Sequence, residues 1–275
     1  MISNQIKFQK KDFSKIINSL KINGVAIVES FYDKDLIDNA RSVILDLFLK
    51  DSANKYSIKK WSHPNEDGQQ IIAYQKFLES KTNSIFKKLF QNSFLKDISE
   101  EYYFPNTFEF NEKLRFTYLK SSNKFLTDWH YDPSQSLKFW VYLTDTDETN
   151  GALSIAPGTQ FLGRLMSENN ILKGSSIKNM KTSISDDNIL LKNRISLNAS
   201  CKDLIIFDPD TFHQGGLIEK GKERIVAYSY TFPLPKKKDI SVFSPGFLLK
   251  SFLNINKYIK KYPKRILGKN SYFEL

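Results

Sequence analysis

Three residues of this chain have the types and the spacing of a metal centre. His130 stands two residues before Asp132, and His213 follows much later in the chain. Because side chains alternate between the two faces of a β-strand, a His-x-Asp pair near the end of a strand places both side chains on one face. A histidine from a distant strand can then complete a triangle of two imidazoles and one carboxylate. This donor set leaves positions open on the metal, as iron(II) oxygen chemistry requires.

A second reading of the same residues is structural. His130 and His213 could be hydrogen-bonded histidines of the core, since a lone His-x-Asp pair arises often by chance. Arg224 favours the metal centre because it lies on the next expected strand after His213. There its guanidinium could bind a carboxylate through two parallel hydrogen bonds. Arg224 could instead pair with Asp208 or Asp210 in a structural role.

A series of short β-strands must position these residues. β-Prone runs separated by turn signals cover residues 114–119, 137–144, 152–156, 203–207 and 224–232. The polar residues 166–188 interrupt the series, and we expect a surface loop there. Thr117 and Arg115, on the strand before the triad, could reach a cosubstrate or substrate.

The first third of the chain has a different pattern. A β-branched run after Gly24 predicts a strand over residues 24–28, and Asp33 can begin a helix over residues 34–49. Residues 71–95 predict a second helix. Helices followed by many short strands indicate a helical N-terminal layer on an all-β sandwich or barrel.

The order of these motifs resembles the phytanoyl-CoA dioxygenase family of iron(II)/2-oxoglutarate oxygenases. The resemblance rests on the His-x-Asp pair, the segment Asn-Gly-Ala-Leu-Ser-Ile-Ala-Pro-Gly-Thr at 150–159, the aliphatic run that ends in Phe207-Asp208, and then His213 and Arg224. It covers about residues 114–232, and residues 24–49 also resemble the family's N-terminal segment. Two positions depart from the family pattern: Gly215 replaces a frequent hydroxyl residue, and Gln160 replaces a usual histidine.

The resemblance implies a mainly β fold with N-terminal helices on a double-stranded β-helix, the cupin-like jelly roll. It implies that His130, Asp132 and His213 bind iron(II) and that Arg224 holds the distal carboxylate of the cosubstrate 2-oxoglutarate. Trp140 falls where the family often has a tryptophan that contacts the cosubstrate, although a strand tryptophan can equally belong to the core. Cosubstrate contacts are thus expected from Arg224, Trp140 and Thr117.

The expected activity is that of a dioxygenase. It would hydroxylate a small molecule with O2 and release succinate and CO2. The same triad could also support desaturation, cyclisation or demethylation. A zinc hydrolase would leave Arg224 and the segment 150–159 without a role, and a catalytically silent jelly roll that binds a ligand is the non-enzymatic alternative.

The composition excludes several classes of protein. With 275 residues, of which 40% are hydrophobic, the chain can form a sizeable core, which excludes a wholly disordered protein. Its apolar runs are too short to cross a bilayer, and its single cysteine excludes an intrachain disulfide framework. Residues 1–11 are polar and do not begin a signal peptide. These features favour the cytoplasm.

The resemblance implies one oxygenase domain, and the distribution of charge indicates a basic C-terminal extension. We expect a helical layer over about residues 1–100, a jelly-roll core over about 105–235 and a C-terminal extension over 236–275. That extension has ten basic and two acidic residues, so it carries +8 of the net charge of +11. We expect it to pack on the core with its lysines in water, although it also suits a weak contact with an anionic membrane surface. No specific nucleic-acid partner is expected.

Overall fold

The structure is a computed structural model that describes residues 5–49, 58–62, 67–73, 84–111, 113–122, 124–175 and 180–234. Its helices are α1 (Phe13–Asn23), α2 (Lys34–Leu49), α4 (Ser84–Phe90), α5 (Ser93–Tyr103), α6 (Gln160–Leu172) and the 3-10 helix η5 (Ile189–Asn193). Its strands up to residue 121 are β1 (Lys7–Phe8), β2 (Val25–Val28), β3 (Ile58–Ser62), β4 (Asp67–Ala73), β5 (Thr107–Phe110) and β6 (Leu114–Ser121). The later strands are β7 (Leu137–Tyr142), β8 (Ser154–Ile155), β9 (Ile195–Ser196), β10 (Leu204–Phe207), β11 (His213–Gln214) and β12 (Arg224–Leu234).

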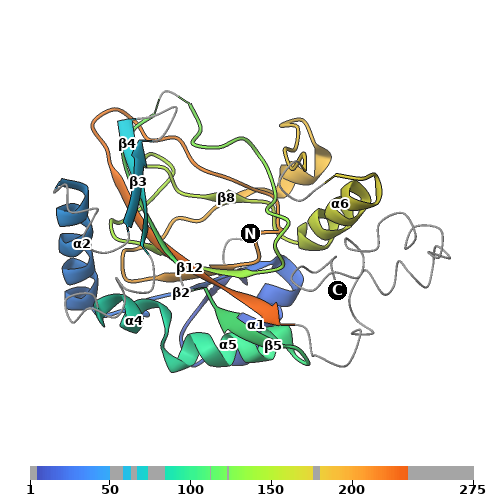
Figure 1. Ribbon diagram of the computed structural model, residues 1–275, viewed down its shortest axis with the longest axis horizontal. Helices are drawn as coiled ribbons and strands as arrows, with labels where there is room; N and C mark the ends of the chain where they lie inside the picture. The colour runs from blue at the N-terminus through green and yellow to red at the C-terminus, as the bar shows by residue number, and fades with distance from the viewer. Residues whose placement is uncertain are drawn as a thin grey trace.

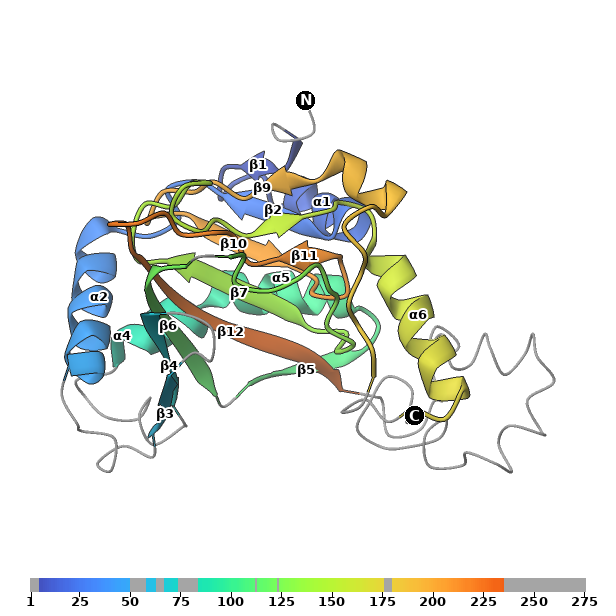
Figure 2. The ribbon, with the colours of Figure 1, turned by 90° about the horizontal axis from the view of Figure 1, so that it is seen from above.

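The described strands form two sheets. The larger sheet has the order β1-β2-β10-β7-β12-β6-β4-β3, with β5 paired to β12, and the smaller sheet has the order β11-β8-β9. Figure 2 shows β2, β10, β7 and β12 running side by side across the molecule. The order brings β12 between β6 and β7, so residues of β6 and β12 that lie more than a hundred positions apart become direct neighbours.

Side-chain alternation gives the larger sheet two buried faces. One face carries Phe116 and Phe139, which pack in one cluster with Leu20 of α1, Ile44 of α2 and Leu95 of α5. Figure 1 shows these helices along one side of the sheet and β8 on the other. The N-terminal helices therefore cover one sheet, as the sequence predicts.

The opposite face of the larger sheet points toward the smaller sheet. Ile27, Tyr142 and Phe207 pack there against Ile155 of β8 and Leu197. Both faces of the central strands are thus apolar, which explains the continuous burial of β2 and β10. Side chains of β6, β7 and β12 that point away from the helices converge in the space between the two sheets, on what we call the inner face.

A glycine connects the helical layer to the sheet. Gly24 ends α1 in the left-handed conformation, with φ 73°, and its N–H donates to Leu20 O. A β-carbon at this position would lie 2.1 Å from the Thr211 side-chain oxygen. Only glycine therefore allows both the helix end and the close approach of the loop that leads to His213.

The prediction of one helix over residues 71–95 is wrong. Ile71, Ile72 and Ala73 belong to β4, where Ile71 pairs with Phe116 of β6. Two separate helices follow, because Asn92 ends one and begins the next by accepting a hydrogen bond from Leu95 N–H. Cross-strand pairing has overridden the helical spacing of apolar residues, and residues 74–83 lie outside the described ranges.

The loop expected over residues 166–188 is wrong in its first part, where α6 continues to Leu172. Gly163 lets this helix pack closely, since a β-carbon there would lie 2.0 Å from Asp210 O. The other expected strands and the helix over residues 34–49 are confirmed within a few residues. The basic extension 236–275 and His63 lie outside the described residues, and none of the described helices is long and apolar enough to span a membrane.

Candidate metal centre

Backbone pairing brings the three predicted metal ligands together. His130 N–H donates to His213 O at 2.9 Å, and His213 N–H donates to His130 O at 2.8 Å. Such a mutual pair places two residues directly opposite each other with their side chains on one face. Asp132 returns to the same face two residues later, held by its N–H bond to Pro209 O at 2.8 Å. One candidate donor atom from each residue lies within 4.8 Å of the others.

Two carbonyl groups orient the histidine rings. His130 Nδ1 lies 2.7 Å from Asp128 O, and His213 Nδ1 lies 2.8 Å from Thr211 O. A carbonyl oxygen only accepts, so in each ring Nδ1 carries the proton and Nε2 has a free lone pair. Both Nε2 atoms face Asp132, at 3.8 Å and 3.9 Å from its two carboxylate oxygens. Metal-binding histidines are held in this way.

Charges around the triad keep it in the protonation state that binds a metal. Burial and the neighbouring His130 lower the pKa of His213 to about 3, so its imidazole is neutral. Burial alone would raise the pKa of the Asp132 carboxyl, but the Lys138 ammonium outweighs it and holds that pKa well below its usual range. Two imidazoles and one carboxylate fit a divalent transition metal such as iron(II).

Lys138 was missed by the sequence analysis. Its Nζ lies 2.5 Å from Asp132 Oδ2, and its side chain is only 12% exposed. The signal was present in the sequence, because Lys138 is a charged residue within the apolar run Leu137–Tyr142. A lysine that faces the interior from a buried strand needs an anionic partner.

Arg224 lies on β12, the strand that follows β11 and its His213 in the chain. It is the first residue of β12 and is 4% exposed. One of its terminal nitrogens donates to Gly151 O, which belongs to the segment 150–159 that resembles the family pattern. Asp208 and Asp210 pair with Arg164 of α6, so the structural partners considered for Arg224 are engaged elsewhere.

Trp140 and Thr117 both face the space between the sheets. Trp140 of β7 stacks on Tyr228 of β12 with ring centroids 4.8 Å apart. Thr117 of β6 is 5% exposed and pairs with Val226. The structure thus places both residues on the inner face that also carries Arg224, and their contact with a cosubstrate stays a prediction.

The two departures from the family pattern have local physical causes. A β-carbon at Gly215 would lie 2.8 Å from the Leu126 β-carbon, so a larger residue does not fit there. The Gly215 N–H donates to the Thr127 hydroxyl at 2.8 Å. Gln160 donates from Nε2 to Lys21 O and Ile22 O and thereby satisfies carbonyls at the end of α1.

The sequence matches the phytanoyl-CoA dioxygenase (PhyH) family over residues 20–226. The chain belongs to this family. Members are non-haem iron- and 2-oxoglutarate-dependent enzymes, so the predicted enzyme class and its cofactors are confirmed at the level of the family. A comparison with curated protein sequences gives no match.

Solved structures of similar fold confirm the double-stranded β-helix. The 2-oxoglutarate-dependent epimerase SnoN from nogalamycin biosynthesis is 14% identical, with a TM-score of 0.59 over 81% of this chain and 83% of that chain. EctD from S. alaskensis is 13% identical, with a TM-score of 0.57 over 78% and 75%. HygX from Streptomyces hygroscopicus, with nickel and 2-oxoglutarate bound, is 10% identical, with a TM-score of 0.52 over 78% and 84%.

Within this family fold, α6 contributes a buried ion-pair network beneath the metal centre. Arg164 binds the Asp208 carboxylate and donates from Nε to Asp210 Oδ2 at 3.2 Å. Tyr102 of α5 donates to Asp208 Oδ2 at 2.6 Å. Burial and the neighbouring Asp208 raise the pKa of the Asp210 carboxyl. Pro209, between them, accepts the Asp132 N–H, so the network supports a candidate metal ligand.

Replacing Arg164 with methionine should lower the free energy of unfolding by about 3 kcal/mol, because it leaves two buried acids without their cation. Chemical denaturation would measure the change. The matched control is Arg41→Met, since Arg41 pairs with a half-exposed Glu223 and such pairs contribute at most about 1 kcal/mol. Equal losses in the two variants would contradict the structural role given to Arg164.

Glu168 of α6 is a buried acid without a hydrogen-bond partner among the described residues. It is 3% exposed, and neither carboxylate oxygen has a hydrogen bond. Burial raises its pKa to about 8. Between pH 4.5 and pH 8 the folded chain therefore holds a proton that the unfolded chain releases, so this group lowers stability as the pH rises through that window.

Glu168→Gln should remove this pH dependence. We expect the free energy of unfolding to rise by about 1–3 kcal/mol at pH 8 and by less than about 1 kcal/mol at pH 5. Denaturation at the two pH values measures the difference. Glu148→Gln, at an exposed position, is the control and should show no such divergence. A gain that is the same at both pH values would show that Glu168 is ionised in the folded protein.

Proposed function

We propose that the chain is a dioxygenase that uses iron(II), O2 and 2-oxoglutarate to hydroxylate a small molecule. The reaction would convert 2-oxoglutarate and O2 to succinate and CO2 and place one oxygen atom in the product. The observation that carries this proposal is the orientation of the histidines: both Nδ1 atoms bond to carbonyls, and both Nε2 atoms face Asp132. We also propose that the enzyme acts in the cytoplasm.

In this proposal, His130, Asp132 and His213 hold the iron. The bound iron and 2-oxoglutarate would supply an oxidant strong enough to remove hydrogen from unreactive carbon. The chain's own contribution is to orient its ligands before the metal binds. The carbonyls of Asp128 and Thr211 fix the two rings, and Lys138 keeps Asp132 ionised.

Arg224 would hold the distal carboxylate of 2-oxoglutarate. Its guanidinium lies in a dry environment, where two parallel hydrogen bonds to a carboxylate are strong. Trp140 and Thr117 would border the cosubstrate on the same inner face. The apolar walls formed by Phe207 and Val226 would exclude water from the site.

Complexes of similar structures support a small-molecule substrate. SnoN has been solved with nogalamycin RO, and HygX with hygromycin B. Their reactions also set the alternatives to hydroxylation, because SnoN is an epimerase and the similar SnoK is a carbocyclase. Substrate identity and reaction outcome are therefore separate questions.

Product analysis tests the proposal. The protein is incubated with iron(II), ascorbate, 2-oxoglutarate and metabolite extracts under isotopically labelled O2, and succinate above the substrate-free background identifies active fractions. Hydroxylation predicts one labelled oxygen atom in the product and one in succinate. An unlabelled product formed with labelled succinate would instead indicate epimerisation, cyclisation or desaturation.

A further inference from the structure

Three cations lie on the inner face of the larger sheet among the described residues of β6, β7 and β12: Arg115, Lys138 and Arg224. Arg224 binds Gly151 O and is assigned to 2-oxoglutarate in the proposed function. Lys138 pairs with Asp132. Arg115 differs from both, because within the described ranges no carboxylate lies within ion-pair distance of it, and its buried Nε has no hydrogen-bond partner there. A half-buried guanidinium without an anion is unfavourable unless a ligand supplies one.

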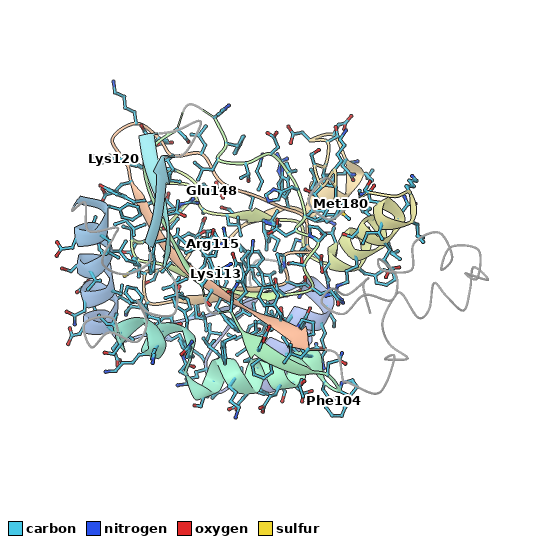
Figure 3. All side chains as sticks on the ribbon, in the orientation of Figure 1. Phe104, Lys113, Arg115, Lys120, Glu148 and Met180 are labelled. Carbon is cyan, nitrogen blue, oxygen red and sulfur yellow. The ribbon has the colours of Figure 1, made fainter. Side chains whose placement is uncertain are left out.

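Arg115 and Lys138 approach the same aromatic ring. The Arg115 guanidinium carbon lies 5.8 Å from the Tyr230 ring centroid, and Lys138 Nζ lies 6.0 Å from it. Strand register explains this arrangement, because Tyr230 pairs with Lys138 and stands two residues beyond Tyr228, the partner of Arg115. Figure 3 shows Arg115 near the centre of the molecule, whereas Lys120 of the same strand extends from its edge.

The position differs from that of the cosubstrate arginine. The Arg115 partner Tyr228 lies four residues along β12 from Arg224, which is about 13 Å along a strand. The two guanidinium groups also point in different directions, one to Tyr230 and the other to Gly151. One carboxylate of 2-oxoglutarate therefore does not need both arginines.

From these contacts we propose that the primary substrate carries an anionic group, a carboxylate, phosphate or sulfate, that binds between Arg115 and Lys138 over the Tyr230 ring. This inference rests on the proposed function and names the substrate class for the same site. Lys138 links the anion site to the triad, since its Nζ also contacts Asp132. When a metal shares the Asp132 charge, the Lys138 ammonium becomes available to a second anion. Anchoring at this point would place the substrate beside the metal centre.

Sulfate is a suitable probe because it is a dianion that does not depend on the unknown substrate. The thermal midpoint of the full-length protein is followed against sulfate at constant ionic strength, with Mn(II) and 2-oxoglutarate present to occupy the cosubstrate site. We expect a saturable rise in the wild type. Arg115→Gln should lose the saturable part, and Arg115→Lys should need several-fold more sulfate. Lys120→Gln is the control for loss of one charge on the same strand, at an exposed position, and should respond like the wild type.

An equal saturable rise in Arg115→Gln and wild type, or a rise without saturation in the wild type, would overturn the inference. Loss of the midpoint shift caused by Mn(II) and 2-oxoglutarate in Arg115→Gln would overturn it as well, since Arg115 would then serve the cosubstrate. A wild type that ignores Mn(II) and 2-oxoglutarate contradicts the proposed function instead. The two failures are therefore distinguishable.

A second experiment tests whether the substrate itself carries the anionic group. A metabolite extract is separated on an anion exchanger, and both fractions are assayed for succinate formation. The retained fraction should stimulate the wild type and Lys120→Gln several-fold more than Arg115→Gln. Stimulation confined to the unretained fraction would overturn the assignment of an anionic substrate.

Discussion

Alanine at His130, Asp132 or His213 is expected to abolish iron-dependent succinate formation and to weaken iron binding by more than about 100-fold. The reason is that each substitution removes one of the three proposed ligands. Loss of an outer-shell partner alone typically costs 10–100-fold in metal affinity or activity. Metal titration and succinate assays measure the two effects separately.

The fold must be monitored in these variants because the triad is part of a charged cluster. Asp132→Ala leaves the Lys138 ammonium without its carboxylate, so a lower thermal midpoint is expected there. His130→Ala should disturb the fold less than His213→Ala, since the two side chains are 23% and 4% exposed. Asp97→Ala on the exposed face of α5 is the matched control. Full activity of Asp132→Ala would contradict its assignment as a ligand.

Arg224→Lys is expected to raise the Michaelis constant for 2-oxoglutarate by about 10–100-fold while leaving iron affinity nearly unchanged. Lysine keeps the charge but lacks the planar fork that binds a carboxylate through two bonds. Truncating one partner of a buried hydrogen-bonded charge pair typically costs about 2–5 kcal/mol of binding free energy. The positive charge that lysine retains should recover part of this free energy. Initial rates over a range of 2-oxoglutarate concentrations measure the change.

The control for Arg224→Lys is the same substitution at the exposed Arg194. It should leave the Michaelis constant for 2-oxoglutarate unchanged. If the constant is also unchanged in Arg224→Lys, another residue binds the distal carboxylate. Arg115 would then be the first residue to examine, because it is the other inner-face arginine of the described strands.

The strands that carry the site could be predicted from the sequence because their signals are local. Alternation and turn residues define β6, β7, β10 and β12. His130 and Asp132 lie between β6 and β7, where His130 forms an isolated bridge with His213. The direct pairing of His130 with His213 could not be predicted from spacing alone. It depends on the antiparallel bridge between two distant segments.

The ion-pair partners of the charged residues could not be predicted from the sequence. Asp208 and Asp210 were possible partners of Arg224, but they pair with Arg164 on α6, a helix whose second half falls in the loop predicted over residues 166–188. The sequence contains the charges but not the approach of α6, which depends on the contact of Gly163 with Asp210 O. Lys138 was missed for a similar reason, since its role depends on the contact with Asp132, which exists only in the folded chain.

The division into an N-terminal layer, a core and a basic extension stays a prediction. Strands β1 and β2 join the larger sheet from within the N-terminal hundred residues, so that part contributes to the β core as well as to the helical layer. The proposed membrane or packing role of the basic extension 236–275 also stays a prediction, because those residues lie outside the described ranges.

The central claim is that this chain couples bound iron to the oxidation of 2-oxoglutarate. Its most direct test is the consumption of O2 and 2-oxoglutarate and the formation of succinate by the full-length protein before and after metal removal. We predict that the chelated protein is inactive, that iron(II) restores turnover with equal amounts of 2-oxoglutarate consumed and succinate formed, and that zinc does not. Turnover that persists without metal, or an iron-loaded protein that leaves 2-oxoglutarate unchanged, would contradict the claim.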